Sequence, residues 1–268
     1  GSLWGYSPRN SISLILHGTE MQRFYHHRYY RKAFQKLIDK SEKIGVVSTY
    51  NEKWLLAHFR VDPQNVCLVP GALRHDFQAS TPNKKREGKI KMLTVGRIHP
   101  RKGQHAVLEA LSRMNAREQS KIDYRIIGPI VHKRYFQRLN KRIRSLETHV
   151  VMDNQVTAHE LWEAYSRADL FVMTSLPYKH SIEGLGMVYL EAGAHGLPSI
   201  AHNIGGVKDA VIHDKTGLLV DYEDREALTS SIRKLLHNDS LRERLGRSAM
   251  EHAWSHSWEE NVKRLFAS

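Results

Sequence analysis

The sequence predicts an α/β protein in which parallel strands alternate with helices, arranged in two unequal parts. From residue 90 to about 220, short apolar runs that suit buried strands alternate with stretches of helical periodicity. This order is expected for β-α-β units with right-handed crossovers. Residues 79–89 are polar and lysine-rich and contain proline and glycine, which indicates a linker. The 268 residues suit one large domain or two modest ones.

The first part, residues 1–78, has few predicted elements. They are strands at 11–16, 43–48 and 65–70 and helices at about 22–40 and 51–58. The single cysteine, Cys67, falls in the third strand, where we expect a buried thiol in a reducing compartment. A typical domain has about 100–150 residues, so this part is short for a complete one.

The second part begins with the strand IKMLTVG at 90–96, followed by RIHPRKG and the helix pattern QHAVLEALSRM. A further strand, YRIIGP, covers 124–129. From about residue 224 to the end the pattern is helical, with breaks near Asn238 and Ser255. No internal repeat is visible, and no apolar run is long enough to span a membrane.

The stretch EGLGMVYLE at 183–191 places two glutamates on either side of a glycine-rich helix start. Apolar residues after Gly186 predict a buried helix that runs to His195 and ends before Gly196 and Pro198. Glu183 then lies in the entry loop and Glu191 inside the helix. The free N–H groups of a helix start favour phosphate, and carboxylates accept hydrogen bonds from sugar hydroxyls. The pair alone fits a sugar-nucleotide site and two solvated glutamates equally well.

Two basic residues follow the strand at 90–96. Ligands of parallel α/β sheets bind at the carboxyl ends of strands, and Arg97 and Lys102 come just after such an end. Arginine presents a fork of donors to phosphate oxygens, and lysine presents a compact charge. A single basic residue there is usually just solvated. Two of them around a proline-containing turn favour an anion site.

In these motifs the chain resembles the retaining, nucleotide-sugar-dependent glycosyltransferases of GT-B architecture, the group called family 4, with its glycosyltransferase group 1 domain. The resemblance runs from about Ile90 to Val220 and includes five blocks in the family's order. They are TVGRIHPRKG, YRIIGP, VTAHELWEAYSRADLFVMTS, SIEGLGMVYLEAGAHGLPSIAHNIGG and DAVIHDKTGLLV. The resemblance implies a GT-B-like fold with a Rossmann-type nucleotide-binding domain at the carboxyl end.

The resemblance also implies roles for individual residues. Arg97 and Lys102 would hold the donor diphosphate, Glu191 the ribose hydroxyls and Glu183 the hydroxyls of the transferred sugar. We therefore expect Glu183→Gln to leave the affinity for a bare nucleoside diphosphate nearly unchanged. The remaining donor-binding positions implied are Gly96, Gly184, Leu185, Gly186 and Met187.

His17, at the end of the first strand, matches a family position near the donor sugar. The expected catalytic set is therefore Glu183, His17, Arg97 and Lys102. The alternative for His17 is a histidine that merely ends a strand. The resemblance implies no cofactor and no metal, since arginine and lysine would neutralise the diphosphate. The implied reaction is hexosyl transfer with retention, in glycan, glycolipid or polysaccharide biosynthesis.

The resemblance divides the chain into a partial acceptor-side Rossmann-like domain at 1–78 and a linker at 79–89. A nucleotide-sugar-binding domain at 90–250 and a helix at 251–268 that returns to the first part would follow. Because the first part is shorter than its counterpart in the family, we expect a truncated or naturally minimal amino-terminal domain. Either self-association through its open sheet edge or a partner that covers this region is then expected. The alternative to an enzyme is a non-catalytic or partner-dependent nucleotide-sugar-binding subunit.

The net charge of +13 reflects 41 basic against 28 acidic residues. Basic residues cluster at 23–36 and 132–145, where aromatic residues are interleaved. Such helices are compatible with an anionic membrane surface, and no recognised module accompanies them that would indicate nucleic acid. The alternative is that these are ordinary solvated faces. We expect a cytoplasmic protein, peripheral at a membrane if the clusters bind lipid, whose acceptor is a glycan, a lipid-linked sugar or a small molecule.

Overall fold

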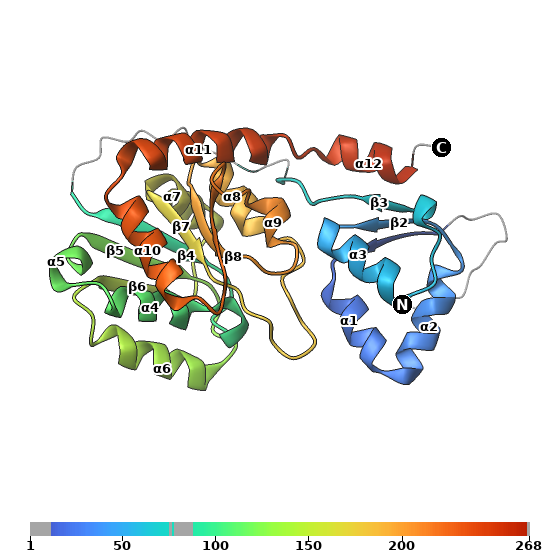
Figure 1. Cartoon of the computed structure of the whole chain (residues 1–268), viewed down its shortest axis with the longest axis horizontal. Coiled ribbons are helices and arrows are strands. Elements are labelled where there is room, and N and C mark those ends of the chain that lie inside the picture. Colours follow the sequence, from blue (N-terminus) through green and yellow to red (C-terminus); the bar gives the residue numbers. More distant parts are fainter. Residues whose placement is uncertain (1–11, 75–76, 78–87, 267–268) are drawn as a thin grey trace.

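The computed structural model describes residues 12–74, 77 and 88–266. Two parallel sheets organise the described chain (Figure 1). One has three strands in the order β1-β2-β3, and the other has six in the order β6-β5-β4-β7-β8-β9. We call the regions built on these sheets the small part and the large part. The expectation of a parallel α/β fold is confirmed.

The small part alternates strands and helices in sequence order. Its elements are β1 (Ile12–Leu16), α1 (Thr19–His26), α2 (Arg28–Ile38), β2 (Ser41–Val46), α3 (Thr49–His58), the 3₁₀ turn η1 (Pro63–Asn65) and β3 (Val66–Leu68). Both strand pairings are parallel. Its core gathers apolar side chains from the strands and from α1, α2 and α3, including Met21, Phe34, Ile44 and Leu55. Among the described strands, β1 and β3 form the edges of this sheet.

The prediction of a single helix at about 22–40 is wrong, because this segment forms two helices, α1 and α2. His27 between them has an extended backbone, with φ −113° and ψ 110°. The break lets α1 fold back on α2, so that the Phe24 ring lies 5.1 Å from the Phe34 ring. Aromatic packing between the two short helices therefore replaces the continuation of one long helix.

The large part contains the remaining strands and all but the last of the remaining helices. Its elements are β4 (Ile90–Val95), η2 (Pro100–Lys102), α4 (Gln104–Ser112), α5 (Ala116–Gln119), β5 (Ile122–Ile127), α6 (Lys133–Ile143), β6 (His149–Asp153), α7 (Ala158–Arg167), β7 (Leu170–Met173), α8 (Met187–Ala194), β8 (Ser199–His202), α9 (Val207–Ala210), β9 (Gly217–Val220), α10 (Arg225–Leu236) and α11 (Asp239–Trp254). One core lies between the sheet and α4, α6 and α10, and the other between the sheet and α7, α8 and α9.

The strand order of the large sheet reverses between β4 and β7, which are hydrogen-bonded neighbours. Successive strands run outward from β4 to β6 on one side and from β7 to β9 on the other. The loops after β4 and β7 therefore leave the same sheet edge in opposite directions and open a crevice. This switch point brings the segment that contains Arg97 and Lys102 next to the loop that leads into the stretch at 183–191.

The chain returns to the small part after α11. The last helix, α12 (Trp258–Phe266), lies along β2 and β3 of the small part, as Figure 1 shows. Leu265 is buried there, and the Asn261 side-chain amide donates to the Pro70 carbonyl. The chain thus passes between the two parts twice, once between β3 and β4 and once between α11 and α12.

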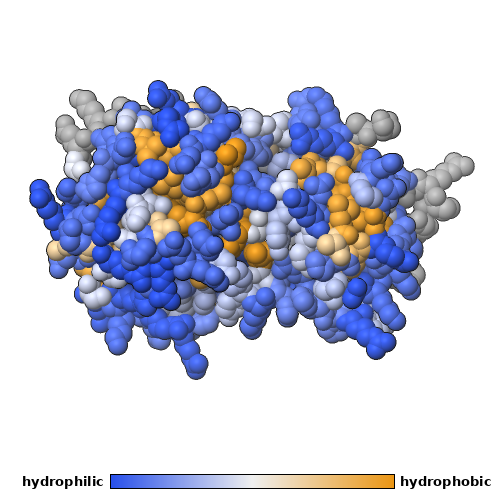
Figure 2. Space-filling model, in the orientation of Figure 1, coloured by the Kyte–Doolittle hydropathy of each residue, from blue (hydrophilic) through white to orange (hydrophobic). Residues whose placement is uncertain are grey.

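Cys67 is half-buried, not buried as expected, because β3 lies at the edge of the small sheet. The expected linker at 79–89 lies outside the described residues except for its last two. None of the described helices is both long enough and apolar enough to cross a membrane. The face shown in Figure 2 is largely hydrophilic, with an apolar area on each part.

Candidate donor-binding site

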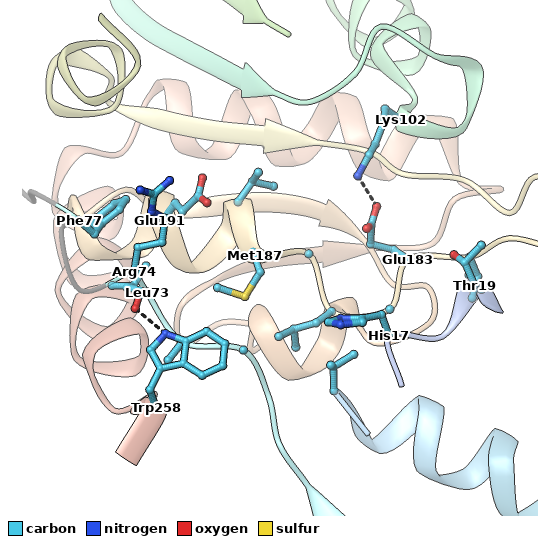
Figure 3. A pocket seen from close by; sticks show the side chains of 18 of the residues that line it. His17, Thr19, Leu73, Arg74, Phe77, Lys102, Glu183, Met187, Glu191 and Trp258 are labelled. Carbon is cyan, nitrogen blue, oxygen red and sulfur yellow. Dashed lines mark hydrogen bonds and ion pairs between the residues drawn. The ribbon is translucent and has the colours of Figure 1, made fainter. Parts of the chain in front are cut away.

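A cavity of about 520 Å³ opens between the small and large parts. Its walls come from the ends of β1 and β2, the segment after β3, the switch-point loops, the start of α8 and the first residue of α12. The side chains that line it include His17, Thr19, Leu73, Arg74, Phe77, Arg101, Lys102, Glu183, Leu185, Met187, Glu191 and Trp258. Figure 3 labels all of these except Arg101 and Leu185. Cationic, carboxylate and aromatic groups from distant parts of the sequence thus meet in one crevice.

Glu183 is the centre of a buried ionic cluster at one end of the cavity. Its Oε2 accepts from Lys102 Nζ at 2.7 Å, from Arg101 Nη1 at 3.2 Å and from Ser175 Oγ at 2.8 Å. All three side chains with charge have exposed fractions of only 11–12%. One carboxylate therefore faces two cations in a region that excludes most water.

Burial and charge act in opposite directions on this cluster. Burial alone would raise the pKa of Glu183, but Lys102 and Arg101 outweigh it, so this pKa lies below the usual value. Burial lowers the pKa of Lys102, and the nearby Glu183 partly opposes that shift. Glu183 is thus held as a carboxylate, and the ammonium of Lys102 depends on its acidic partner.

The backbone of Arg101 is tied down on both sides. Its N–H donates to the ring of His99 at 3.0 Å, and its carbonyl accepts from the Leu176 N–H at 2.7 Å. The next residue but one, Gly103, has φ +70°, and a Cβ there would lie 1.7 Å from the Thr174 carbonyl oxygen. Only glycine fits this close crossing of the two switch-point loops.

Glu191 lies toward the other end of the cavity, near Arg74 and Phe77 in Figure 3. Burial raises its pKa, although the Tyr165 hydroxyl donates to Oε2 at 2.8 Å. The expected helix is confirmed as α8, and Glu191 is its fifth residue. Met187, at the helix start, lies between the two glutamates in the same view.

Glycines bring the small part against the switch-point loop. A Cβ on Gly184 would lie 2.1 Å from the carbonyl oxygen of His17, so the two backbones touch. Nearby, the carboxylate of Asp209 accepts from the backbone N–H and the hydroxyl of Thr49. The exposed side chain of His17 reaches the cavity from this contact. The small part thus supplies one wall of the site.

The structure brings most of the predicted residues to the cavity: His17, Lys102, Glu183, Gly184, Leu185, Gly186, Met187 and Glu191. Gly96 and Arg97 do not line it. A Cβ on Gly96 would lie 3.8 Å from the Lys102 stem, and the Arg97 side chain is exposed. The charge of Arg97 nonetheless acts on Lys102, whose pKa it lowers slightly.

Sequence reasoning missed Arg101, Ser175, Tyr165 and Trp258. Arg101 stands directly beside Lys102, but nothing in the sequence says that its guanidinium turns inward. Trp258 comes from α12, and its indole N–H donates to the Leu73 carbonyl at 3.0 Å at the rim of the cavity (Figure 3). Within the described residues, no three histidine, cysteine or acidic side chains are grouped so that they could hold a metal.

Known proteins with similar sequences align with most of this chain. A D-inositol 3-phosphate glycosyltransferase of Corynebacterium glutamicum (strain R) is 29% identical, over 86% of this chain and 57% of the relative. A GDP-mannose-dependent alpha-(1-6)-phosphatidylinositol monomannoside mannosyltransferase of Mycobacterium tuberculosis is 30% identical, over 77% of this chain and 55% of the relative. The chain thus spans a little over half the length of these relatives.

Solved structures share the fold. A sucrose-phosphate synthase of Thermosynechococcus elongatus superposes with a TM-score of 0.77 at 20% identity, covering 93% of this chain and 65% of that one. Anabaena Alr3699/HepE in complex with UDP-glucose gives 0.73 at 16% identity, covering 96% and 69%. These likenesses confirm the GT-B-like fold expected from the sequence.

The family model described as glycosyl transferases group 1 matches residues 76–252, which is more than half of the chain. The matched range contains both glutamates, both predicted basic residues and the whole switch point. The resemblance noted in the sequence is therefore confirmed: this chain belongs to the group 1 glycosyl transferase family.

Proposed function

We propose that this chain transfers a sugar from a nucleotide-sugar donor to an acceptor hydroxyl with retention of anomeric configuration. The observation that carries the proposal is the Glu183 cluster with Lys102 and Arg101 at the switch point, with Glu191 further along the same cavity. Family membership supports the reaction class. The names of relatives and neighbours suggest GDP-mannose and UDP-glucose as the first donors to test.

In this proposal the donor lies along the cavity. Glu191 accepts hydrogen bonds from the ribose, and the backbone amides around Gly184–Met187 together with Lys102 and Arg97 bind the diphosphate. Arg97 reaches the phosphates by turning from its exposed position. Glu183 contacts hydroxyls of the transferred sugar, and its described contacts all end on Oε2, which leaves Oε1 for the ligand.

The chemistry we propose is electrostatic. The bond between the anomeric carbon and the phosphate oxygen loosens first, and the cations stabilise the charge that grows on the leaving diphosphate. The acceptor hydroxyl then attacks from the same face, and its proton passes to the departing phosphate oxygen. Glu183 and His17 hold the sugar in place for this attack. We propose that Lys102 and Arg97 neutralise the diphosphate without a metal ion.

Turnover is the direct test of this proposal. The chain is incubated with UDP-, GDP- and ADP-sugars and a mixture of glycan and phospholipid acceptors, and the anomeric configuration of the product is read by NMR. Lys102→Ala and Arg97→Ala should each weaken nucleoside diphosphate binding by about 10- to 100-fold. Binding without transfer to any acceptor would favour the alternative, a non-catalytic or partner-dependent subunit. No binding of any nucleotide would refute both.

We further propose that the protein docks on an anionic membrane surface and acts at the cytoplasmic face. All five basic residues of α6 are exposed, and this helix contains no acidic residue. The turn between α1 and α2 carries more exposed cations, and Tyr29 and Tyr30 beside it are 79% and 53% exposed. Both regions lie along the lower edge of the molecule in Figure 1. One flat membrane surface would therefore contact both parts. The proposal includes no nucleic-acid partner.

Vesicle co-sedimentation tests the docking proposal. Each cation near an anionic surface contributes about 1 kcal/mol, so Arg134→Gln/Lys141→Gln should weaken binding to phosphatidylglycerol vesicles by about 30-fold. The matched control, Arg117→Gln/Arg247→Gln, removes the same charge from exposed positions on α5 and α11. Equal losses in both variants would mean that binding follows net charge alone, and the proposed face would be wrong.

Self-association is a separate proposal. β1 is an edge strand among the described strands, and Ile15 on it is 50% exposed. An open parallel edge with exposed apolar side chains favours pairing with a second copy. Light scattering across protein concentrations should show a mass above the monomer, which Ile15→Lys should reduce. A concentration-independent monomer would exclude this association.

A further inference from the structure

Two cations, Lys102 and Arg101, share one carboxylate in the Glu183 cluster. Lys102 reaches Glu183 through a flexible four-carbon stem. Arg101 reaches it with a planar guanidinium. The backbones of both residues are held, since the Arg101 N–H donates to the His99 ring and the Lys102 N–H donates to the His99 carbonyl. Both side chains are about nine-tenths buried, so water from the cavity is a poor substitute for either as a partner of the carboxylate.

Donor binding creates a conflict in this cluster. The proposed function, on which this inference rests, gives Lys102 to the diphosphate, and Lys102 is now bound to Glu183 at 2.7 Å. A buried carboxylate that loses its only counter-ion is strongly destabilised. Lys102 can therefore turn to a phosphate only if another cation keeps Glu183 charged.

We propose that Arg101 is the permanent counter-ion of Glu183, and that Lys102 exchanges between Glu183 and the donor diphosphate. Arg101 is then a positioning residue, which acts through Glu183 without touching the donor. The cluster has the composition that such an exchange requires, since it holds two positive charges and one negative charge before the ligand arrives. After exchange, Arg101 and Ser175 still bind Glu183 Oε2, at 3.2 and 2.8 Å in the structure.

A double-mutant cycle tests this role with UDP, GDP and ADP as probes in calorimetry. In Arg101→Gln, diphosphate binding must remove the last cation from Glu183, so we expect the affinity to fall by about 10- to 100-fold. In a Glu183→Gln background no charge needs a counter-ion. There Arg101→Gln should change the affinity by less than about threefold, as for uncoupled substitutions.

Proton uptake supplies a second readout that a merely structural role would not change. In Arg101→Gln, loss of Lys102 to the ligand raises the pKa of Glu183, so binding takes up a proton. Compared with native protein, the affinity of this variant should therefore recover as the pH falls from 8 to 5.5. Arg101→Lys keeps the charge and should stay within about threefold of native affinity. Arg125→Gln is the control, because Arg125 pairs with Asp153 outside the cavity.

The outcomes separate the two proposals. Native protein that binds none of the three nucleoside diphosphates would refute the proposed function and this inference with it. Native binding with an unchanged affinity in Arg101→Gln would refute the role of Arg101 alone. An equal loss in both backgrounds would mean that Arg101 contacts the phosphates directly. If circular dichroism shows that Arg101→Gln does not fold, the double variant Arg101→Gln/Glu183→Gln is compared with Glu183→Gln alone. A loss of diphosphate affinity above threefold in that comparison again refutes the role.

Discussion

Glu183→Gln should tighten the binding of a bare nucleoside diphosphate. In the native protein the diphosphate must compete with Glu183 for Lys102, whose Nζ lies 2.7 Å from the carboxylate. A charge-assisted hydrogen bond contributes about 1.5–3 kcal/mol, so its removal should raise the affinity by about tenfold or more. Sequence reasoning alone predicts no change, because it assigns Glu183 only to the sugar. The structure therefore changes the expected sign of the effect.

The same variant should lose stability without a ligand. Glu183→Gln leaves two cations, each about 11–12% exposed, facing each other without a counter-charge. Breaking a buried pair in this way costs about 3–5 kcal/mol. A nucleoside diphosphate at 100 times its Kd should restore about 2.7 kcal/mol. The gain in affinity should shrink as the pH rises, because without Glu183 the already lowered pKa of Lys102 falls further.

Calorimetry with UDP and GDP and thermal unfolding with and without each ligand check both effects. Glu109→Gln is the control, since Glu109 also pairs with arginines, Arg113 at 3.1 Å, Arg225 at 2.9 Å and Arg142 at 3.6 Å, but lies outside the donor cavity. It should leave diphosphate affinity unchanged. Weaker diphosphate binding in Glu183→Gln would refute the competition between carboxylate and ligand, and with it the reasoning from the 2.7 Å contact.

Three further predictions concern two residues that line the site and a buried histidine that packs against Phe77. Glu191→Gln should weaken nucleoside diphosphates and nucleotide sugars equally, by about tenfold, in calorimetry, because the ribose is common to both; a loss confined to the sugar-bearing ligand would contradict this. Gly184→Ala should destabilise the chain by about 1–3 kcal/mol in urea unfolding, because its Cβ would lie 2.1 Å from the His17 carbonyl oxygen; unchanged stability would mean that the contact yields freely. Burial lowers the pKa of His195 to about 4, so the unfolded chain binds more protons below pH 6.5. His195 alone should then lower the free energy of unfolding by about 1.4 kcal/mol per pH unit from 6.5 towards 4, and His195→Leu should remove that contribution from the slope.

The sequence was sufficient for features that depend on local chemistry. Glycine and proline bound the helix that carries Glu191, and apolar periodicity identifies its buried face, so α8 could be predicted to within a residue. The strand before Lys102 was equally clear. These patterns hold because the backbone conformation there follows from neighbouring residues.

Features that depend on distant partners could not be predicted. The break at His27 arises because rings from two helices pack together, and no local breaker marks it. Arg101 faces Glu183 only because the loops after β4 and β7 cross at the switch point. Cys67 is half-buried because nothing described pairs with the outer edge of β3. In each case the missing information was which segments become neighbours in space.

The path of α12 has a consequence for how the chain folds during synthesis. β2 and β3 are made early, yet the helix that covers them, with Leu265 and Asn261 turned inward, is made after every strand of the large part. The apolar surface of the small sheet that α12 covers therefore stays exposed while the large part folds. A nascent chain halted before Trp258 would hold a complete large sheet and a small sheet without its covering helix, and a chaperone that binds exposed apolar strands would find its target in the small part.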